Sequence, residues 1–225
     1  MKKFEYLILD VIILFSPFLG RIFYSNFSMP NVKYFLISTF LASVIFWIWD
    51  FLVTNRWWYF NDEYLIGLKV FNLPIEEVIF FPAVSFSCFL IWINLKKFFL
   101  GSFSSNFISL FTILLVVLSL FLSVYFFRKK RFYTSVVLIS QVLVIIFDFL
   151  LGTKLILLKS FWLFIIIILF LTFIFNFYLT YRPIVLYKES YKSGKKIFSI
   201  PIEDFIYGVV FLYLNLLIYE FLIKL

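Results

Sequence analysis

The sequence predicts an all-α integral membrane protein, with seven transmembrane helices arranged as two parallel three-helix repeats joined by a linker helix. An apolar composition, seven long apolar segments and an internal duplication predict this fold. Of the 225 residues, 64% are hydrophobic and only 14% are charged, and the mean hydropathy is +1.08. A soluble domain carries far more charge, so the composition places the chain in lipid.

Seven segments are long and apolar enough to cross a bilayer, which takes about 20 residues. They are centred near Ile13, Ala42, Phe86, Val116, Val142, Ile168 and Phe211. The first follows two lysines and precedes no Ala-x-Ala cleavage site. We therefore expect a retained first span rather than a removed signal peptide.

The basic residues predict how the chain lies across the membrane. An odd number of spans puts the two termini on opposite sides, and 13 of the 20 Lys and Arg residues then share the side of the N-terminus. Cytoplasmic loops are rich in Lys and Arg, so we expect a multi-pass protein of the cell membrane with a cytoplasmic N-terminus and the C-terminus outside. The net charge of +8 lies in short loops, which fits anionic lipid and not nucleic acid.

An internal duplication organises the chain. Residues 67–77 and 194–204 align without gaps, and both read G-x-K-x-F-x-x-P-I-E-acid. With one extra residue in the second copy, residues 50–56 match 176–182. We therefore predict a first three-helix repeat over 1–99, a linker helix over 100–129 and a second repeat over 130–225. Each copy has three spans, so two copies in direct succession would enter the bilayer from opposite sides. The linker span adds one crossing, so both copies enter from the same side.

Two tandem acids follow the shared proline in each copy, namely Glu76 and Glu77 in the first and Glu203 and Asp204 in the second. Proline and an acid in the first turn favour helix initiation, which is sufficient for one copy. Helix initiation does not explain why both copies contain two acids at this place. Inserting an ionised acid into the bilayer costs free energy, up to about 2.5 to 3.5 kcal/mol at the centre of a membrane helix. We therefore predict a functional role for the four acids, with Glu76 and Glu203 favoured first.

Two further polar residues fall on the same side of the membrane. Asp50 ends the second span, and Asn176 takes its place in the second copy. With the four acids, they are predicted to line a cavity between the repeats, where neighbouring carboxyls hold a proton near neutral pH. Asp148 lies away from this cluster, where packing or an interhelical hydrogen bond is expected. The role of Asp10 in the first span is left open.

Trp57, Trp58 and Tyr59 follow the second span. They are expected to form an interfacial aromatic belt, or otherwise part of a pocket for a long hydrophobic substrate. Both roles are compatible.

Absent residue types narrow the chemistry. The chain has no His and a single cysteine, Cys88, so neither a His-based acid nor a Cys-based metal site is expected. It also lacks a P-loop, a G-x-G-x-x-G turn and an Asp-rich diphosphate motif. We expect carboxylates to carry the reaction, with no metal and no cofactor.

At these residues the sequence resembles the small membrane lycopene cyclases of carotenoid pathways, in their fused single-chain form. The resemblance rests on Trp49-Asp50, Trp58, Phe60 and Gly67, and above all on residues 73–81 and 200–205. It implies redox-neutral cyclisation of the linear ends of lycopene, expected to give β-ionone rings, by an intramolecular lyase of the isomerase class that binds no flavin. It also implies that Glu76, Glu77, Glu203 and Asp204 are the catalytic acids.

The resemblance implies a carotenoid substrate dissolved in lipid. In this scheme a carboxylic acid protonates the terminal double bond, the neighbouring alkene captures the cation, and a base removes a ring proton. The two halves differ, because residues 183–185 replace the Trp57 region of the first copy. Ring type, the number of ends cyclised, carotenoid length and oligomeric state stay open.

Other functional classes share this architecture. A small-solute transporter is the main alternative, because parallel three-helix repeats also describe sugar-type transporters that bind at the midplane. Here the repeated polar residues gather at one membrane edge and offer a sugar few partners. A retinal-binding protein is disfavoured because Lys224 is the only lysine near the last span.

Overall fold

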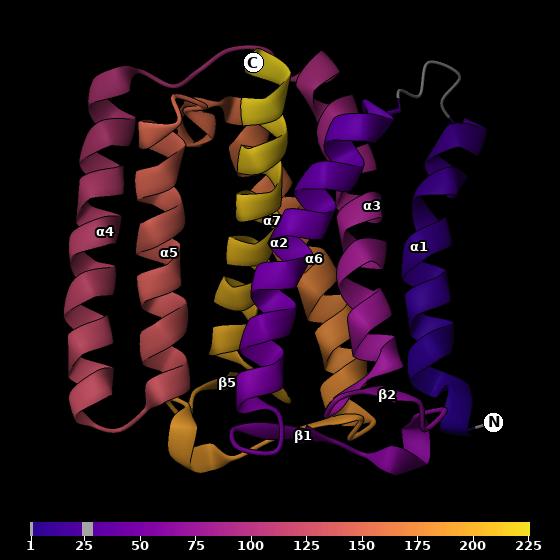
Figure 1. The fold of residues 1–225 in the computed structure, drawn as a ribbon. Coiled ribbons are helices and arrows are strands. Elements are labelled where there is room, and N and C mark those ends of the chain that lie inside the picture. The colour runs from indigo at the N-terminus through magenta and orange to yellow at the C-terminus, as the bar shows by residue number, and fades with distance from the viewer. Residues whose placement is uncertain (1, 24–28) are drawn as a thin grey trace.

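A computed structural model describes residues 2–23 and 29–225, and long helices dominate it (Figure 1). The helices are α1 (Glu5–Phe23), α2 (Val32–Val53), α3 (Ile75–Phe98), α4 (Ser105–Arg128), α5 (Phe132–Leu150), α6 (Lys159–Tyr181) and α7 (Ile202–Lys224). Within the described ranges, α2 to α7 include six segments long and apolar enough to cross a membrane. A multi-pass membrane protein is therefore indicated. The helix α1 lies where the first span is expected, and its crossing of the bilayer stays a prediction.

Short strands and 3-10 turns connect the helices. They are η1 (Lys2–Phe4), β1 (Trp58–Phe60), η2 (Asp62–Tyr64), β2 (Lys69–Val70), β3 (Leu73–Pro74), η3 (Leu155–Leu157), β4 (Val185–Tyr187), η4 (Glu189–Tyr191), β5 (Lys196–Ile197) and β6 (Ile200–Pro201). β2 and β3 form one hairpin, and β5 and β6 form another. All six strands lie at the end of the bundle where the chain begins, and the chain ends at the opposite end (Figure 1).

Equivalent elements of the two copies are separated by a constant number of residues. This number, which also separates Ile75 from Ile202, is called the repeat offset. These two residues begin α3 and α7. The starts of α1 and α5 are separated by the same offset, as are those of α2 and α6 and those of the strands that follow. The helix α4 has no counterpart and packs at the edge of the bundle against α5 (Figure 1).

The extra residue of the second copy falls after Arg182, in the connection between α6 and β4. The side chain of Asn72 donates to the Thr54 carbonyl over 3.5 Å. Its counterpart at the repeat offset, Ser199, bonds the Thr180 hydroxyl over 2.7 Å. Thr180 thus takes the place of Thr54, in line with the predicted match of residues 50–56 with 176–182.

One strand pair joins the two copies. β1 and β4 pair antiparallel, and Tyr59 lies opposite Leu186 at the centre of the register. These two residues are themselves one repeat offset apart, so the pair has the symmetry of a twofold axis through its middle. An ion pair also joins the copies, with the Arg182 Nη2 donating to Glu5 Oε1 over 2.6 Å.

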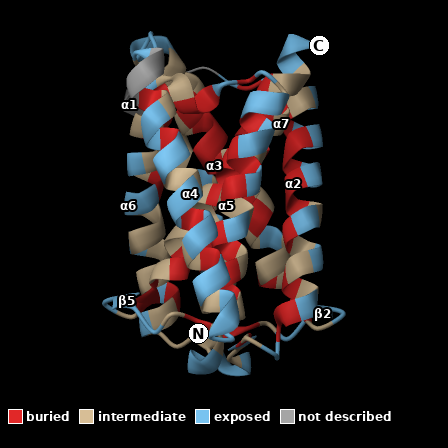
Figure 2. Ribbon diagram, turned by 90° about the vertical axis from the view of Figure 1, so that its left-hand side faces the viewer, coloured by how far each residue is buried: buried red, intermediate tan, exposed pale blue. Residues whose placement is uncertain are grey.

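The helices α3 and α7 form the centre of the bundle, and each packs against helices of both copies. Phe46 on α2 contacts Phe211 on α7 with ring centroids 4.9 Å apart, and Phe81 on α3 contacts the same ring at 5.0 Å. Buried residues face inward, while the outer faces of the helices are exposed (Figure 2). Large apolar residues occupy those outer faces, such as Ile166 and Phe170. An apolar outer surface of this kind is stable in lipid and not in water.

Pro17 shapes α1. Proline has no amide hydrogen, so the Ile13 carbonyl one turn earlier loses its helical donor. The hydroxyl of Ser16 donates to this carbonyl over 3.0 Å, and the hydroxyl of Ser87 on α3 donates to it as well. The broken helical bond thus becomes a contact between α1 and α3.

Asp148 confirms the expected interhelical hydrogen bond. Its buried carboxylate accepts from the Tyr213 hydroxyl on α7 at 2.7 Å and from the amides of Leu155 and Ile156 at 2.9 and 3.0 Å. The Thr153 hydroxyl also donates to it. This carboxylate holds the turn between α5 and α6 at the end of the bundle opposite the strands.

Replacing Asp148 with alanine leaves these donors unpaired in an apolar interior. We expect Asp148→Ala to lower the free energy of unfolding by about 3 kcal/mol or more. Asp62→Ala is the control, because this 73% exposed side chain makes only a surface ion pair with Lys69, worth less than about 0.5 kcal/mol. Thermal unfolding in detergent measures both, and equal melting temperatures would contradict the anchoring role.

Candidate active site

The first acid of each pair binds the backbone of its own loop. Glu76 Oε1 accepts from the amide of Ile66 over 2.7 Å, and Glu203 Oε1 accepts from the amide of Ser193 over 2.7 Å. Both carboxyl groups are fully buried. Each acid therefore closes a loop that begins ten residues earlier, and the two contacts are equivalent in the two copies.

The shared glycine and proline of the duplicated motif build these loops. Gly67 and Gly194 have φ of +94° and +85°, values that side chains other than hydrogen disfavour. Directly after them, the carbonyls of Leu68 and Lys195 accept from the first amides of α3 and α7. The helices begin immediately after the prolines, as the sequence predicts.

The second acid of each pair accepts a hydrogen bond from a tyrosine of its own copy. Glu77 accepts from the hydroxyl of Tyr6 on α1, and Asp204 accepts from the hydroxyl of Tyr133 on α5 over 2.9 Å. The two tyrosines are one repeat offset apart, so this contact is duplicated too.

A small polar cavity of about 60 Å³ lies between the copies. Three carboxyl groups line it, those of Asp50, Glu77 and Asp204. Asp50 accepts from the Tyr207 hydroxyl over 2.8 Å, and its carboxyl is hydrogen-bonded to that of Glu77. Where two carboxyls lie in contact, a proton held between them relieves the repulsion of two like charges.

Asp204 has a different set of partners. The hydroxyls of Tyr133 and Tyr187 donate to it at 2.9 and 2.8 Å, and the amide of Asn176 donates at 3.5 Å. Three donors suit an ionised carboxylate. In the first copy Phe60 stands at the position of Tyr187, so Glu77 lacks one of these donors.

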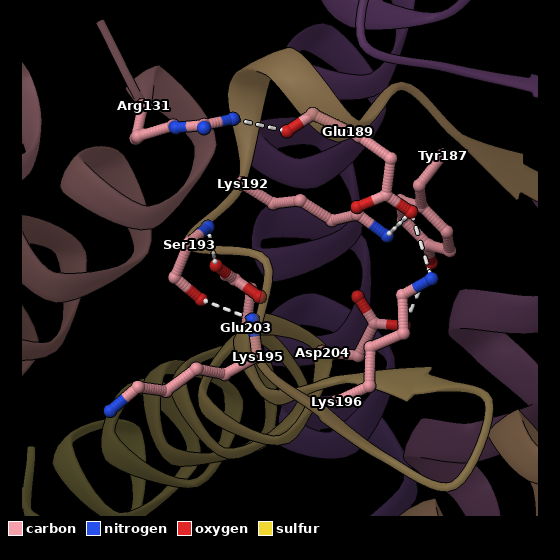
Figure 3. Close-up of polar contacts among 9 residues, drawn as sticks. All are labelled: Arg131, Tyr187, Glu189, Lys192, Ser193, Lys195, Lys196, Glu203 and Asp204. Atoms are coloured by element: carbon pink, nitrogen blue, oxygen red, sulfur yellow. Dashed lines mark hydrogen bonds and ion pairs between the residues drawn. The ribbon is translucent and has the colours of Figure 1, made fainter. Parts of the chain in front are cut away.

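A buried lysine lies beside this half of the cavity (Figure 3). Lys192 is 2% exposed, lies 5.4 Å from the centre of the Tyr187 ring, and makes an ion pair with Glu189 at 3.1 Å. Burial lowers the pKa of Lys192. The hydrogen bond from Lys196 holds the pKa of Glu189 below its usual value. Leu65 is the counterpart of Lys192, so this charge exists in one copy only.

The predicted site residues thus fall into two groups. Glu77, Asp204, Asp50 and Asn176 meet at the cavity, whereas Glu76 and Glu203 lie behind it on their loops.

The aromatic residues after the second span have separate environments. Trp58 is buried and lines the cavity, Trp57 stacks on Tyr191 at 5.5 Å, and Tyr59 is 42% exposed. Their role as a substrate pocket stays a prediction.

Asp10 belongs to the buried cluster rather than to the interface. It is 1% exposed, and neither of its carboxylate oxygens has a hydrogen-bond partner among the described residues. The carboxyl groups of Glu76 and Glu77 on α3 are its acidic neighbours.

Sequence reasoning missed the tyrosines Tyr6, Tyr133, Tyr187 and Tyr207, and it counted Lys192 only as a loop charge. Tyr6 and Tyr133 are separated by the same offset as the two acid pairs. Extending the repeat upstream would have found these two. Lys192 leaves no such signal, because its counterpart is leucine.

The described residues contain no group of three His, Cys, Asp or Glu placed to hold a metal ion. The absence of a metal stays a prediction.

The sequence of the chain is similar to that of a known protein family in both copies of the repeat. The model of the lycopene cyclase family matches residues 4–95 and 130–222, which is most of the chain. The chain belongs to the lycopene cyclase family. The two matched segments cover most of the two copies and leave out the whole of α4.

A curated relative is the bifunctional lycopene cyclase/phytoene synthase of Leptosphaeria maculans, with 33% identity over 63 residues. That match covers 28% of this chain and 11% of the relative, so the chain spans only a small part of that longer protein. No solved structure matches the chain.

Removing the first acid should open its loop. We expect Glu203→Ala to speed amide hydrogen exchange around Ser193, because that amide loses its acceptor, while the loop around Ile66 exchanges as before. Glu203→Gln should slow exchange again, since its amide oxygen still accepts. Exchange followed by mass spectrometry compares both loops in one sample. Unchanged exchange around Ser193 would refute the contact.

Proposed function

We propose that this protein is a lycopene cyclase that converts the linear ends of lycopene into β-ionone rings without net redox change. The observation that carries the proposal is the cavity between the copies, where Asp50, Glu77 and Asp204 meet beneath apolar helices. Family membership supports the substrate class. The site supplies carboxyl groups, which are the acids and bases that such a cyclisation needs.

In this proposal the chain crosses the cell membrane seven times, as repeats over 1–99 and 130–225 joined by a linker over 100–129. The constant spacing of the elements and the symmetric pairing of β1 with β4 support parallel repeats. The strand-bearing end, which holds the N-terminus, faces the cytoplasm. The cavity therefore lies near the cytoplasmic edge of the bilayer.

The pair Asp50 and Glu77 is proposed as the acid. Its shared proton adds to a carbon of the terminal double bond, and the next alkene attacks the resulting carbocation, so that one ring bond forms. Asp204, which accepts three hydrogen bonds, then removes a proton from a ring carbon and restores a double bond. One proton enters and one leaves, so electrons and atoms balance. The proton returns to the pair through the cavity that all three carboxyls line.

Aromatic rings are proposed to stabilise the cation. Trp58, Phe80 and Tyr207 line the same cavity, and the face of an aromatic ring attracts positive charge by about 0.5 to 2 kcal/mol. Glu76 and Glu203 are proposed to position the second acids by holding the loops. No cofactor enters this scheme.

Expression in a lycopene-accumulating bacterial host, followed by pigment analysis, tests the proposal. The unaltered chain should yield cyclised carotenoid, and Asp204→Asn should lower the rate by at least about 100-fold, the usual contribution of a general base. Glu63→Gln is the control, because this exposed acid lies on η2 outside the cavity. If lycopene alone accumulates while the unaltered protein is present in the membrane, the function is wrong.

A further inference from the structure

Two apolar grooves flank the centre of the bundle. The first, called groove A, has a volume of about 450 Å³ and lies among α1, α3, α6 and α7. The second, called groove B, has about 370 Å³ and lies among α2, α5 and α7. They are counterparts in the two copies, because Ser16 on α1 lines groove A and Leu143, one repeat offset later on α5, lines groove B.

Only groove A reaches the acids. It shares four residues with the polar cavity, including Asp204 and Asn176. Among the described residues, groove B shares only Tyr207 with that cavity, and no carboxyl group lines it. The Tyr207 hydroxyl donates to Asp50, so the tyrosine stands between groove B and the carboxyl pair.

The Trp57 region accounts for part of this difference. The indole of Trp49, which lines groove B, packs edge-on against Trp57 with ring centroids 5.0 Å apart. In the second copy Phe175 takes the place of Trp49 and lines groove A. Residues 183–185 replace the Trp57 region there, so groove A lacks a corresponding tryptophan pair at its polar end.

Gly208 lies at the wall of groove A, where a Cβ would approach the Thr172 hydroxyl to 3.3 Å. The missing side chain therefore lets α6 and α7 approach each other closely beside the groove. Its counterpart Phe81 also lines groove A.

Groove A has the dimensions of an extended hydrocarbon. It follows α3 from Phe80 to Phe98, a rise of about 27 Å at 1.5 Å per residue. The hydrocarbon core of a bilayer is about 30 Å thick. Within the described residues, α1 and α6 both pack on α3 and have few backbone contacts with each other. Glu5 at the start of α1 accepts from Tyr178 near the end of α6, at the strand-bearing end. We infer that groove A opens to lipid between α1 and α6 beyond that contact. A long apolar molecule can enter there sideways.

We propose that the linear carotenoid binds in groove A, with one end at Asp204 and its chain along α3, and that groove B takes no substrate end. This inference rests on the proposed function and adds to it the groove in which the substrate lies. The protein then has one reaction centre despite its duplicated acids. A second ring requires the molecule to leave, turn round and enter groove A again.

A matched pair of substitutions tests the asymmetry. Leu171→Trp fills groove A and Ile45→Trp fills groove B, at positions of α6 and α2 that correspond when Asn176 is aligned with Asp50. We expect Leu171→Trp to lower cyclisation at least about tenfold, because the indole takes the space of buried hydrocarbon. Ile45→Trp should stay within about twofold of the unaltered protein. Membrane abundance and melting temperature of both variants show that each one folds.

A second measurement separates binding from turnover. Carotenoid that copurifies with Asp204→Asn is quantified by absorbance per mole of protein, alone and combined with each tryptophan substitution. Loss with Leu171→Trp only supports groove A, even if the unaltered protein forms no ring and the proposed function fails. Equal loss with both substitutions, loss with neither, or loss with Ile45→Trp only would overturn the inference.

Discussion

The contact between the first acid of each pair and a backbone amide ten residues earlier is the constraint on which the site depends. Near the membrane edge an unpaired amide and an unpaired carboxyl are both costly, and each satisfies the other at 2.7 Å. The contact fixes the rotation of α3 and α7 about their axes. Adjacent residues on a helix point about 100° apart, since one turn holds about 3.6 residues. Glu77 and Asp204 are thereby turned toward the interface of the two copies.

The duplicated frame then holds two unlike carboxyl sites. In the first copy Glu77 meets Asp50, so two acids share one environment. In the second copy Asp204 accepts three hydrogen bonds and lies near the buried Lys192. Environments that shift the pKa values of two carboxyls apart suit one as an acid and the other as a base, and the proposed mechanism assigns them in this way. In that proposal the two copies share one frame, and a few side-chain differences between them divide the roles.

Much of the fold can be predicted from the sequence, because helices that cross the hydrocarbon core of a bilayer must be long and apolar and because the sequence contains an internal repeat. The acid motif predicted the starts of α3 and α7, and Asp148 took its expected interhelical bond. The strands were not predicted, since two or three residues carry no periodic signal. Sequence favoured Glu76 and Glu203 by their matching offset, which Glu77 and Asp204 share equally. Only the three-dimensional position of the loop amides distinguishes the acid that holds a loop from the acid that faces the cavity.

The division of roles within one acid pair is tested most directly by the cyclisation rates of Glu77→Gln and Glu76→Gln, measured side by side in membranes with equal amounts of protein. The amide oxygen introduced by Glu76→Gln can still accept from the Ile66 amide, so this variant keeps its loop contact and most of its rate. Glu77→Gln removes the proton donor, and its rate should be about 100-fold lower than that of Glu76→Gln. Equal losses, or a larger loss in Glu76→Gln, would contradict the assignment.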